Sequence, residues 1–467
     1  MTVDRVSILP NPEALKYALA HPVEAWSSGW QALQAYLEHL PWEMAGHLLE
    51  TFIFYYPLFM AYTWITGAII YFLWQERGTP TDASSLPPLS VYPPVSILIP
   101  CYNEADNVRE TVEYALKQQY PEFEIIAIND GSRDDTLAIL EQLAREYPLL
   151  RVVNLASNQG KATALRAGAL LARSEFLVCI DGDALLDPTA CAWMIRHFLD
   201  NPAVGAVTGN PRIRTRSTLL GKIQVGEFSA IVGMIKRAQS VYGRIFTVSG
   251  VIAAFRRSAL HRVDYWSNDM ITEDIDISWK LQLDGALIRF EPRALCWVLM
   301  PETLKGLWRQ RVRWAQGGAE VLLRYGHRML HRSARRLWPI YAECLISILW
   351  AYLMLAALAF ESVTTLLEWY EPGHHVGILP TWTGMLLSLT CLIQFAVSLG
   401  IDARYEARHK GGARYYYWMI WYPLVYWLIN VMTTVTGCYR AVRKKRGQRA
   451  VWITLDRGIT RRDTTRH

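Results

Sequence analysis

Four stretches of this chain are long and apolar enough to span a lipid bilayer, and they constrain its fold more than any other feature. They cover residues 48–74, 340–367, 381–401 and 417–438, and the last two form a closely spaced pair. Each has about 20 residues or more, the length that the hydrocarbon core of a membrane requires. The chain also contains 19 Trp and 24 Tyr, and these residues concentrate at membrane interfaces. A buried core helix could explain one such stretch, but four together predict a membrane protein.

Between the first stretch and the other three, charged residues, Gly and Pro return to the density of a soluble domain. These changes in composition predict seven consecutive segments. They are an amphipathic lead (1–47), a transmembrane span (48–75), a Pro-rich linker (76–94), a catalytic domain (95–300), interfacial helices (301–338), three transmembrane segments (339–440) and a basic tail (441–467).

Basic residues beside the spans predict the orientation of the chain. Arg77 precedes the soluble domain and several arginines follow it over 324–336, which places the domain in the cytoplasm. Crossing three later spans would leave the basic loop 403–414 inside and the equally basic stretch 440–449 outside. Pro423 could break the last segment into a re-entrant piece, and the sequence leaves both arrangements open.

The soluble domain shows the pattern of an α/β fold. Short apolar runs over 95–100, 124–129 and 176–180 indicate buried strands, and the stretches 104–118 and 135–146 have apolar residues at helical spacing. Buried strands that alternate with helices predict a mostly parallel sheet covered on both faces. Such sheets bind ligands at the carboxyl ends of their strands.

Polar residues collect where these strands end. The first strand ends in Pro100–Glu104, the second in Asn129–Ser132, and Asp181-Gly182-Asp183 follows the third. One acid after a strand is usually a helix cap, but Asp181 and Asp183 are alternate residues, so both carboxylates can face one crevice. Oxygen ligands of this kind hold Mg²⁺ or Mn²⁺ together with substrate phosphates. A glycine-containing turn is the alternative explanation.

Three carboxylates, Glu273, Asp274 and Asp276, follow Thr272 within four positions. The simple explanation is the start of a helix, because Thr can cap and acids suit the positive end of the helix dipole. Sugar transfer from a nucleoside diphosphate offers another explanation, since it needs a carboxylate that takes the proton of the incoming hydroxyl. If Asp181 and Asp183 hold a metal, Asp274 or Glu273 is left for that task.

Two basic motifs complete the candidate site. Lys161 follows Gly160 and can pair with a diphosphate as a point charge, although a surface lysine is an equal alternative. The stretch Gln310–Trp314 (QRVRW) precedes the basic edge of the membrane region. Arg313 could contact the diphosphate and Trp314 could stack on a sugar, or both could anchor the chain at the membrane interface.

The order NDGS, DGD, TED and QRVRW after one N-terminal span resembles the family 2 processive glycosyltransferases, which include the cellulose, chitin and hyaluronan synthases. Stretches such as FTVSGVIAAFRRSAL and MITEDIDISWKLQL are similar to the bacterial synthases of poly-β-1,6-N-acetyl-D-glucosamine. The resemblance covers roughly residues 50–460 and is weak over 1–45. It implies a GT-A fold and an inverting polymerase that uses UDP-GlcNAc.

The resemblance also implies a role for each motif residue. Asp130 would hold the uridine together with Pro100, Asn103 and Glu104. Asp181 and Asp183 would bind the diphosphate and Mg²⁺ or Mn²⁺, with Asp183 the preferred direct ligand. Asp274 would be the general base, and the diphosphate and acceptor sugar would contact Glu273, Gln310, Arg313 and Trp314. We add Lys161 to the residues that bind the donor.

Several expectations about partners and alternatives accompany this reading of the motifs. The polymer would pass between the spans of the bacterial inner membrane, in contact with lipid, and a small membrane subunit and cyclic di-GMP would control the enzyme; no nucleic-acid partner is expected. Three other functions stay open: a chitin- or hyaluronan-type synthase of the same fold, an enzyme that adds one sugar to a lipid carrier, and a transport or scaffold protein. QRVRW and the later spans argue against an enzyme that adds one sugar to a lipid carrier. The complete set of acids argues against a transport or scaffold protein.

Overall fold

The computed structural model describes residues 42–79, 85–368, 382–406, 413–445 and 447–450. The chain divides into two compact units, Met1–Phe54 and Tyr55–His467, and the division falls inside helix α3 (Trp42–Tyr71). Almost all of the amphipathic lead that we expected over 1–47 lies outside the described residues.

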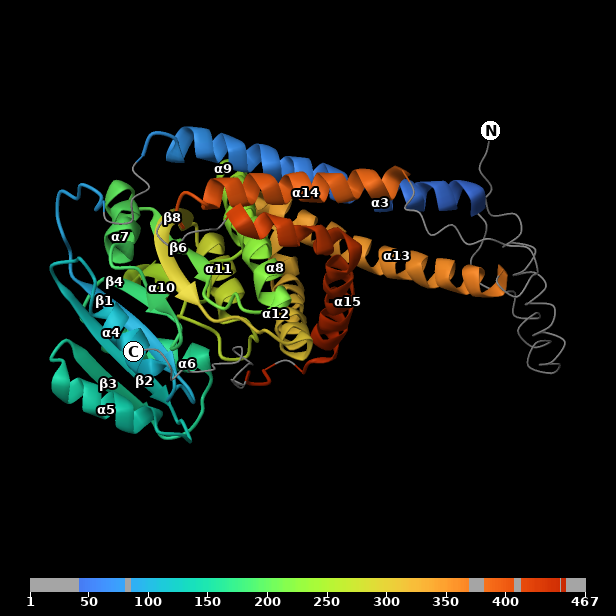
Figure 1. Ribbon diagram of the computed structural model, residues 1–467. Helices are drawn as coiled ribbons and strands as arrows, with labels where there is room; N and C mark the ends of the chain where they lie inside the picture. Colours follow the sequence, from blue (N-terminus) through green and yellow to red (C-terminus); the bar gives the residue numbers. More distant parts are fainter. Residues whose placement is uncertain (1–41, 80–84, 369–381, 407–412, 446, 451–467) are drawn as a thin grey trace, which may run out of the picture. The chain divides into compact units, whose positions relative to one another are not determined.

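The larger unit contains an eight-stranded mixed sheet (Figure 1). Its spatial order is β3-β2-β1-β4-β7-β6-β8-β5. The strands are β1 (Val95–Cys101), β2 (Phe123–Asp130), β3 (Leu150–Leu155), β4 (Phe176–Ile180), β5 (Leu185–Leu186), β6 (Val204–Ile213), β7 (Ile252–Arg256) and β8 (Leu287–Val298). Strands β3, β2, β1 and β4 run parallel, as do β6 and β8, whereas β7 is antiparallel to both of its neighbours. The three predicted strands and the mostly parallel sheet are confirmed.

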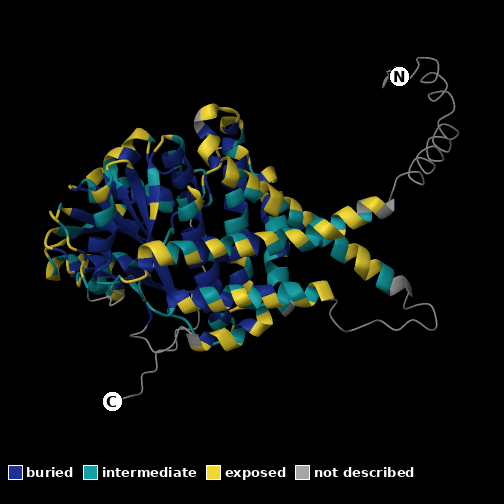
Figure 2. Cartoon of the chain, turned by 90° about the horizontal axis from the view of Figure 1, so that it is seen from above, coloured by how far each residue is buried: buried dark blue, intermediate teal, exposed yellow. Residues whose placement is uncertain are grey.

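Helices cover both faces of this sheet because successive residues of a strand point to opposite sides. Ile97 and Ile99 of β1 belong to one hydrophobic core and Leu98 to another. The first core is completed by α4 (Val108–Ala115), α5 (Thr136–Glu146) and α7 (Ala190–Asp200), and the second by α6 (Lys161–Leu171), α10 (Arg257–Arg262) and α11 (Glu273–Leu283). Figure 2 shows the result as dark-blue strands between helices whose outer residues are exposed.

The strand order creates a crevice at one edge of the sheet. From β1 the chain moves outward through β2 and β3, and it then returns to place β4 on the other side of β1. The connections that leave the carboxyl ends of β1 and β4 therefore run in opposite directions along the sheet. Open α/β sheets bind ligands in the crevice between two such connections. The segments Pro100–Glu104 and Asp181–Asp183 both lie at this point.

Within the described residues, three helices are long and apolar enough to cross a membrane: Gly46–Glu76, Ala334–Thr365 and Trp382–Asp402. They correspond to three of the four predicted stretches and are built from α3 with the π-helical turn η1 (Phe72–Glu76), from α13 (Trp338–Glu368) and from α14 (Trp382–Asp402). The fourth stretch, 417–438, differs from a simple span. It is divided among the 3₁₀ helix η6 (Ala413–Trp421), the π-helical turn η7 (Tyr422–Tyr426), which contains Pro423, and α15 (Trp427–Arg443).

Helix α15 packs along α12 (Leu304–Tyr325), the helix that carries QRVRW. Ala319 of α12 forms a small apolar cluster with Cys438 and Ala441 of α15. After α15, the Lys444 ammonium donates to the carbonyl of Asp269 at 2.6 Å and lies 2.9 Å from a Glu320 carboxylate oxygen. The last described residues thus lie against the sheet-containing domain.

A buried network of charges joins two of the long apolar helices to the domain. Arg237 of α9 (Ile235–Tyr242) lies 2.6 Å from Glu76 at the end of η1 and 2.9 Å from Asp402 at the end of α14. Arg212 of β6 lies 2.6 Å from both Asp402 and Glu406. All five side chains are buried. Paired in this way the charges are tolerated, but removing one partner would leave another charge buried and uncompensated.

Candidate functional site

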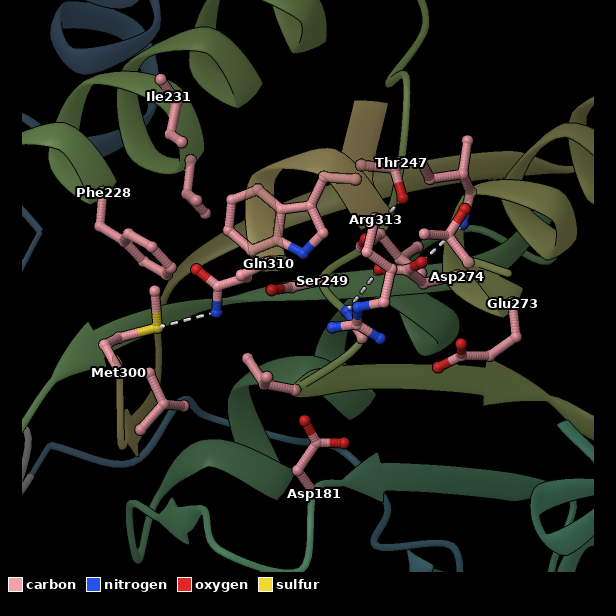
Figure 3. Close-up of a pocket in the computed structure, with 18 of the residues that line it drawn as sticks. Asp181, Phe228, Ile231, Thr247, Ser249, Glu273, Asp274, Met300, Gln310 and Arg313 are labelled. Carbon is pink, nitrogen blue, oxygen red and sulfur yellow. Dashed lines mark hydrogen bonds between the residues drawn. The ribbon is translucent and has the colours of Figure 1, made fainter. Parts of the chain in front are cut away.

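A cavity of about 330 Å³ lies at the crevice between β1 and β4 and extends toward α12 and the helix pair α8 (Leu219–Phe228) and η2 (Ser229–Met234) (Figure 3). Nine of the predicted site residues line it: Glu104, Lys161, Asp181, Asp183, Glu273, Asp274, Gln310, Arg313 and Trp314. The structure thus brings together residues that lie more than 200 positions apart in the sequence. Pro100, Asn103 and Asp130 are not part of its lining and lie beside it.

Asp130 fixes the loop that leads to Lys161. Its carboxylate ends β2, is fully buried, and accepts the backbone N–H groups of Gln159 at 2.7 Å and Gly160 at 2.8 Å. Burial raises the pKa of Asp130, and these two hydrogen bonds oppose the rise. Gly160 has φ +89°, a conformation that side chains with a Cβ rarely adopt, so the turn before α6 requires glycine.

Asn103 ties the segment after β1 to the segment after β2. Its backbone N–H donates to the Ser132 hydroxyl at 3.0 Å, and its side-chain oxygen accepts the N–H of Arg133 at 2.9 Å. Asn103 has φ +54°, in the left-handed region that is uncommon for residues other than glycine. Strained backbone of this kind clusters at ligand sites, where the surrounding contacts hold it in place.

Lys161 begins α6 and connects two of the predicted motifs. Its ammonium lies 2.6 Å from an Asp181 carboxylate oxygen and 2.9 Å from Glu273, and it donates to the carbonyl of Gly250 at 3.1 Å. Burial alone would lower the pKa of Lys161, but the two carboxylates outweigh it and raise this pKa, so the ammonium stays charged. The alternative of a surface lysine is excluded by these contacts.

The three acids that begin α11 point to three different partners. Glu273 pairs with Lys161, which lowers the Glu273 pKa against the opposing effect of burial. Asp276 is fully buried and accepts the Tyr325 hydroxyl at 2.7 Å, away from the cavity. Asp274 lines the cavity. The segment is both a helix start, as the simple explanation predicts, and the wall of a site.

Asp274 has the environment of a carboxylate that can accept a proton near neutral pH. Burial and the neighbouring charge of Glu273 raise its pKa to about 6, although Lys161 and Arg313 oppose the shift. Its two oxygens accept the backbone N–H groups of Ile275 at 3.0 Å and Gly250 at 3.2 Å, which fixes the orientation of the carboxylate. A general base with a pKa close to the working pH is effective, because it is ionised and still basic.

Helix α12 brings the QRVRW residues against α11. A Cβ on Gly317 would lie 1.9 Å from the Thr272 hydroxyl, so only glycine allows this close approach. In the described part of the chain, Oε1 of Gln310 and Nε of Arg313 are buried without a hydrogen-bond partner. Figure 3 shows both side chains at the cavity, with Asp181 on its other side. Buried polar atoms cost free energy unless paired, so these atoms are suited to a polar ligand.

The Trp314 ring forms an aromatic part of the cavity wall. Its centroid is 6.1 Å from that of Phe228, and the Arg311 guanidinium lies 4.3 Å from the indole centroid. Arg311 in turn contacts a Glu227 carboxylate oxygen at 2.6 Å, which also accepts the Tyr426 hydroxyl at 3.0 Å. The indole is therefore supported by a buried ion pair from behind.

Asp181 and Asp183 have the chemistry of a magnesium or manganese site that the substrate completes. Both carboxylates line the cavity, and both follow β4 two positions apart, as the sequence predicts. Within the described ranges, no three His, Cys, Asp or Glu side chains gather into a ready-made metal cage. Mg²⁺ is commonly bound by one or two carboxylates together with substrate phosphates, so the residues fit such an ion.

Two parts of the site were missed from sequence. Lys236 of α9 lines the cavity, but it lies in a stretch without a motif, so no signal pointed to it. Phe228 and Ile231 form the wall toward the apolar helices, and helical periodicity alone identifies such residues only as core. Arg311 belongs to QRVRW, yet its position behind Trp314 follows only from its contact with Glu227 of α8, which also accepts the Tyr426 hydroxyl of η7.

Comparisons with known proteins agree with this geometry. The description "Glycosyltransferase like family 2" matches residues 93–317. Poly-beta-1,6-N-acetyl-D-glucosamine synthase of Staphylococcus epidermidis is 42% identical over 411 residues, which cover 88% of this chain and 99% of the relative. The enzyme of that name from Staphylococcus aureus is 40% identical over the same length.

A solved structure supports the fold. It is a mannosyltransferase from Pyrobaculum calidifontis in complex with GDP-Man and Mn²⁺, with a TM-score of 0.59 and 20% identity, covering 85% of this chain and 98% of that one. The GT-A fold expected from the sequence is confirmed by this likeness. With relatives that match almost from end to end, the chain belongs to the poly-β-1,6-N-acetyl-D-glucosamine synthases of glycosyltransferase family 2.

Proposed function

We propose that the protein polymerises N-acetylglucosamine from UDP-GlcNAc into a β-1,6-linked chain and passes the chain across the membrane. One observation carries this proposal: a single cavity joins the two carboxylates after β4, the carboxylate Asp274 and the aromatic wall formed by Trp314 and Phe228. A site for a nucleoside diphosphate and a site for a sugar acceptor are therefore continuous.

In the proposed reaction, Asp274 acts as general base on the C6 hydroxyl of the acceptor sugar. The hydroxyl oxygen attacks C1 of the donor GlcNAc while its proton passes to the Asp274 carboxylate. The bond between C1 and the diphosphate oxygen breaks, and UDP leaves with the electron pair. Attack opposite to the leaving group converts the α-linked donor into a β-linked product.

Charges in the cavity would stabilise the departing diphosphate. Lys161 and Arg313 supply cations, and the unpaired Oε1 of Gln310 offers an acceptor to a sugar hydroxyl. A divalent ion held by Asp181 and Asp183 would neutralise negative charge that develops on the diphosphate. In the same proposal, Asp130 and the Pro100–Glu104 segment hold the uridine, because they order the loops beside the carboxyl end of β1.

A second cavity supports passage of the polymer between the apolar helices. Its volume is about 310 Å³, and it lies among α3, α13, α14 and α15. Aromatic and amide side chains line it, the combination that suits a sugar chain: Trp64, Trp350, Gln394, Trp427 and Asn430. Ile231 lines both this cavity and the catalytic one, so the two adjoin.

We propose a multi-pass protein of the bacterial inner membrane with its catalytic domain in the cytoplasm. Lys444 and Ala450 hydrogen-bond to the domain at Asp269 and Asn268, so the stretch after α15 lies on the same side as the domain. We propose that the chain crosses the membrane three times and that the 417–438 segment returns to the cytoplasmic side without crossing. All basic stretches then lie on the cytoplasmic side. This arrangement removes the conflict that four crossings create with the positive-inside rule.

The test is polymer synthesis by the purified protein in membranes, supplied with UDP-GlcNAc and Mg²⁺ or Mn²⁺. We expect UDP release and a product that a β-1,6-specific hexosaminidase cuts and chitinase does not. A product cut only by chitinase would retain the mechanism and overturn the linkage. Absence of UDP release, with or without a partner subunit and cyclic di-GMP, would overturn the proposal; the partner and this control are predictions from the resemblance alone.

A further inference from the structure

Lys236 is a cavity-lining charge to which the proposed reaction gives no role. It belongs to α9, its exposed fraction is 5%, and it lines the catalytic cavity. Its ammonium donates to the Thr208 hydroxyl at 2.8 Å. In the part of the chain that the structure describes, it makes no ion pair, unlike Lys161 in the same cavity.

A short chain of contacts connects Lys236 with Asp274. The Thr208 hydroxyl, which accepts from Lys236, also accepts the backbone N–H of Ser249 at 2.8 Å. The next residue, Gly250, donates its N–H to the Asp274 carboxylate at 3.2 Å. The segment that holds the Asp274 carboxylate is thus fixed to the hydroxyl on which Lys236 is anchored.

The position of Lys236 costs free energy that a neutral side chain would not. Burial lowers its pKa to about 7, and the charge of Asp274 is what opposes this fall. A methionine would fill the same space without a desolvation penalty. A buried charge in a cleft with a specific charged neighbour is a functional-site candidate.

We propose that Lys236 is a positioning residue for the glycosyl transfer, whose buried ammonium stabilises the ionised carboxylate of Asp274 while its hydrogen bond to Thr208 holds the Ser249–Gly250 segment. This inference rests on the proposed function, because it requires Asp274 to be the base. Four charged groups then face or adjoin Asp274 from four helices: Glu273 of its own helix α11, Lys161 of α6, Arg313 of α12 and Lys236 of α9.

Three variants separate the charge of Lys236 from its hydrogen bond. Lys236→Gln keeps a donor for Thr208 and removes the charge, Lys236→Met removes both, and Thr208→Val keeps the charge and removes the hydroxyl. Lys117→Met, at an exposed lysine that lies over the Tyr114 ring, is the matched control. For each variant, UDP release is measured as kcat and KM for UDP-GlcNAc from pH 5 to 8, together with the melting temperature.

We expect both Lys236 variants to shift the acid limb of the kcat profile upward by about one pH unit, since a nearby opposite charge lowers a carboxyl pKa by at least that amount. Their kcat should fall about fivefold to tenfold near pH 6 and approach the wild-type value at pH 8, where Lys236 has lost its proton. KM should stay within about twofold, because the proposed role of Lys236 acts on Asp274 and gives Lys236 no contact with the donor. Thr208→Val should lower kcat at every pH without moving the limb.

The outcomes distinguish this inference from the proposed function. Acid limbs of Lys236→Gln and wild type that superimpose would overturn the electrostatic role of Lys236 and leave the polymerase intact. A uniform loss at all pH values in both Lys236 variants would also overturn it, because a merely structural lysine behaves in that way. An Asp274→Asn variant with near-normal kcat would instead overturn the base assignment on which the inference rests.

Discussion

Replacing Asp274 by Asn should abolish catalysis without weakening the fold. Both expectations follow from the removal of a buried carboxylate that can ionise. The substitution keeps the shape of the side chain and removes its ability to take a proton. A positioned general base contributes about 10²–10⁴-fold, so kcat should fall by that factor while KM for UDP-GlcNAc changes little. In the wild type, kcat should fall about tenfold per pH unit below the Asp274 pKa of about 6, because only the ionised carboxylate is a base.

The effect on stability follows from the same pKa. The folded-state pKa of about 6 lies above the ordinary value of 3.8, so ionised Asp274 disfavours folding at every pH above about 6. A difference of about two units corresponds to a penalty of up to about 3 kcal/mol, which disappears as the pH falls below the ordinary value. Asn carries no such penalty, although its amide can accept only one of the two backbone N–H groups that the carboxylate accepts. The melting temperature of the variant relative to wild type should therefore be higher at pH 7 than at pH 4.

Two measurements on the same preparation test this reasoning. Steady-state UDP release gives kcat and KM, and a thermal melt in detergent at pH 7 and pH 4 gives the stability difference. The expected pattern is an inactive variant whose stability relative to wild type is higher at pH 7 than at pH 4. Near-normal kcat would refute the assignment of the base, and a stability difference between variant and wild type that is the same at pH 7 and pH 4 would refute the penalty from burial.

Other variants probe the remaining parts of the site. Asp183→Asn should raise the Mg²⁺ or Mn²⁺ concentration needed for half-maximal activity by about tenfold or more, measured by titration after chelation; an unchanged requirement would contradict its role as a ligand. Lys161→Met should leave the carboxylates of Asp181 and Glu273 without the cation between them, so KM for UDP-GlcNAc should rise about tenfold or more, and a KM equal to wild type would argue against a donor contact. Arg237→Met should lower stability by about 3–5 kcal/mol in a melt, because buried Glu76 loses its ion-pair partner while Asp402 keeps its contact with Arg212, and a variant as stable as wild type would contradict the importance of the Arg237–Glu76 pair.

The sequence predicted the elements whose periodicity and strand-end chemistry are local. The apolar runs at 95–100, 124–129 and 176–180 became β1, β2 and β4, because a run buried on both faces can only be a central strand or a core helix. Nine of the predicted site residues lie around one cavity. For Glu104, Asp181 and Asp183 this follows from the sequence pattern, since parallel strands end at a common edge. Their chemical roles stay predictions until the variants are measured.

What the sequence could not predict depends on contacts between distant segments. Hydropathy identified 417–438 as span-like, but the π-helical turn around Pro423 and the packing of α15 on α12 depend on partners more than 100 residues away. In the sequence, Lys236 does not differ from other lysines in helices. Its position follows from its hydrogen bond to Thr208, which also accepts the N–H of Ser249. The separation of Asp276 from its two acidic neighbours depends in the same way on the Tyr325 hydroxyl.

Arg237 and Arg212 make buried ion pairs with Glu76, Asp402 and Glu406. These pairs oppose movement of the two apolar helices relative to the domain. Pulling either apolar helix away from the domain would separate opposite charges in a medium of low dielectric constant, at a cost of several kcal/mol for each pair. The two helix ends and the domain therefore behave as one rigid frame. If the polymer passes through the second cavity, as we propose, its advance would depend on movements inside that frame, near Ile231 between the two cavities, and not on rocking of the domain on the membrane.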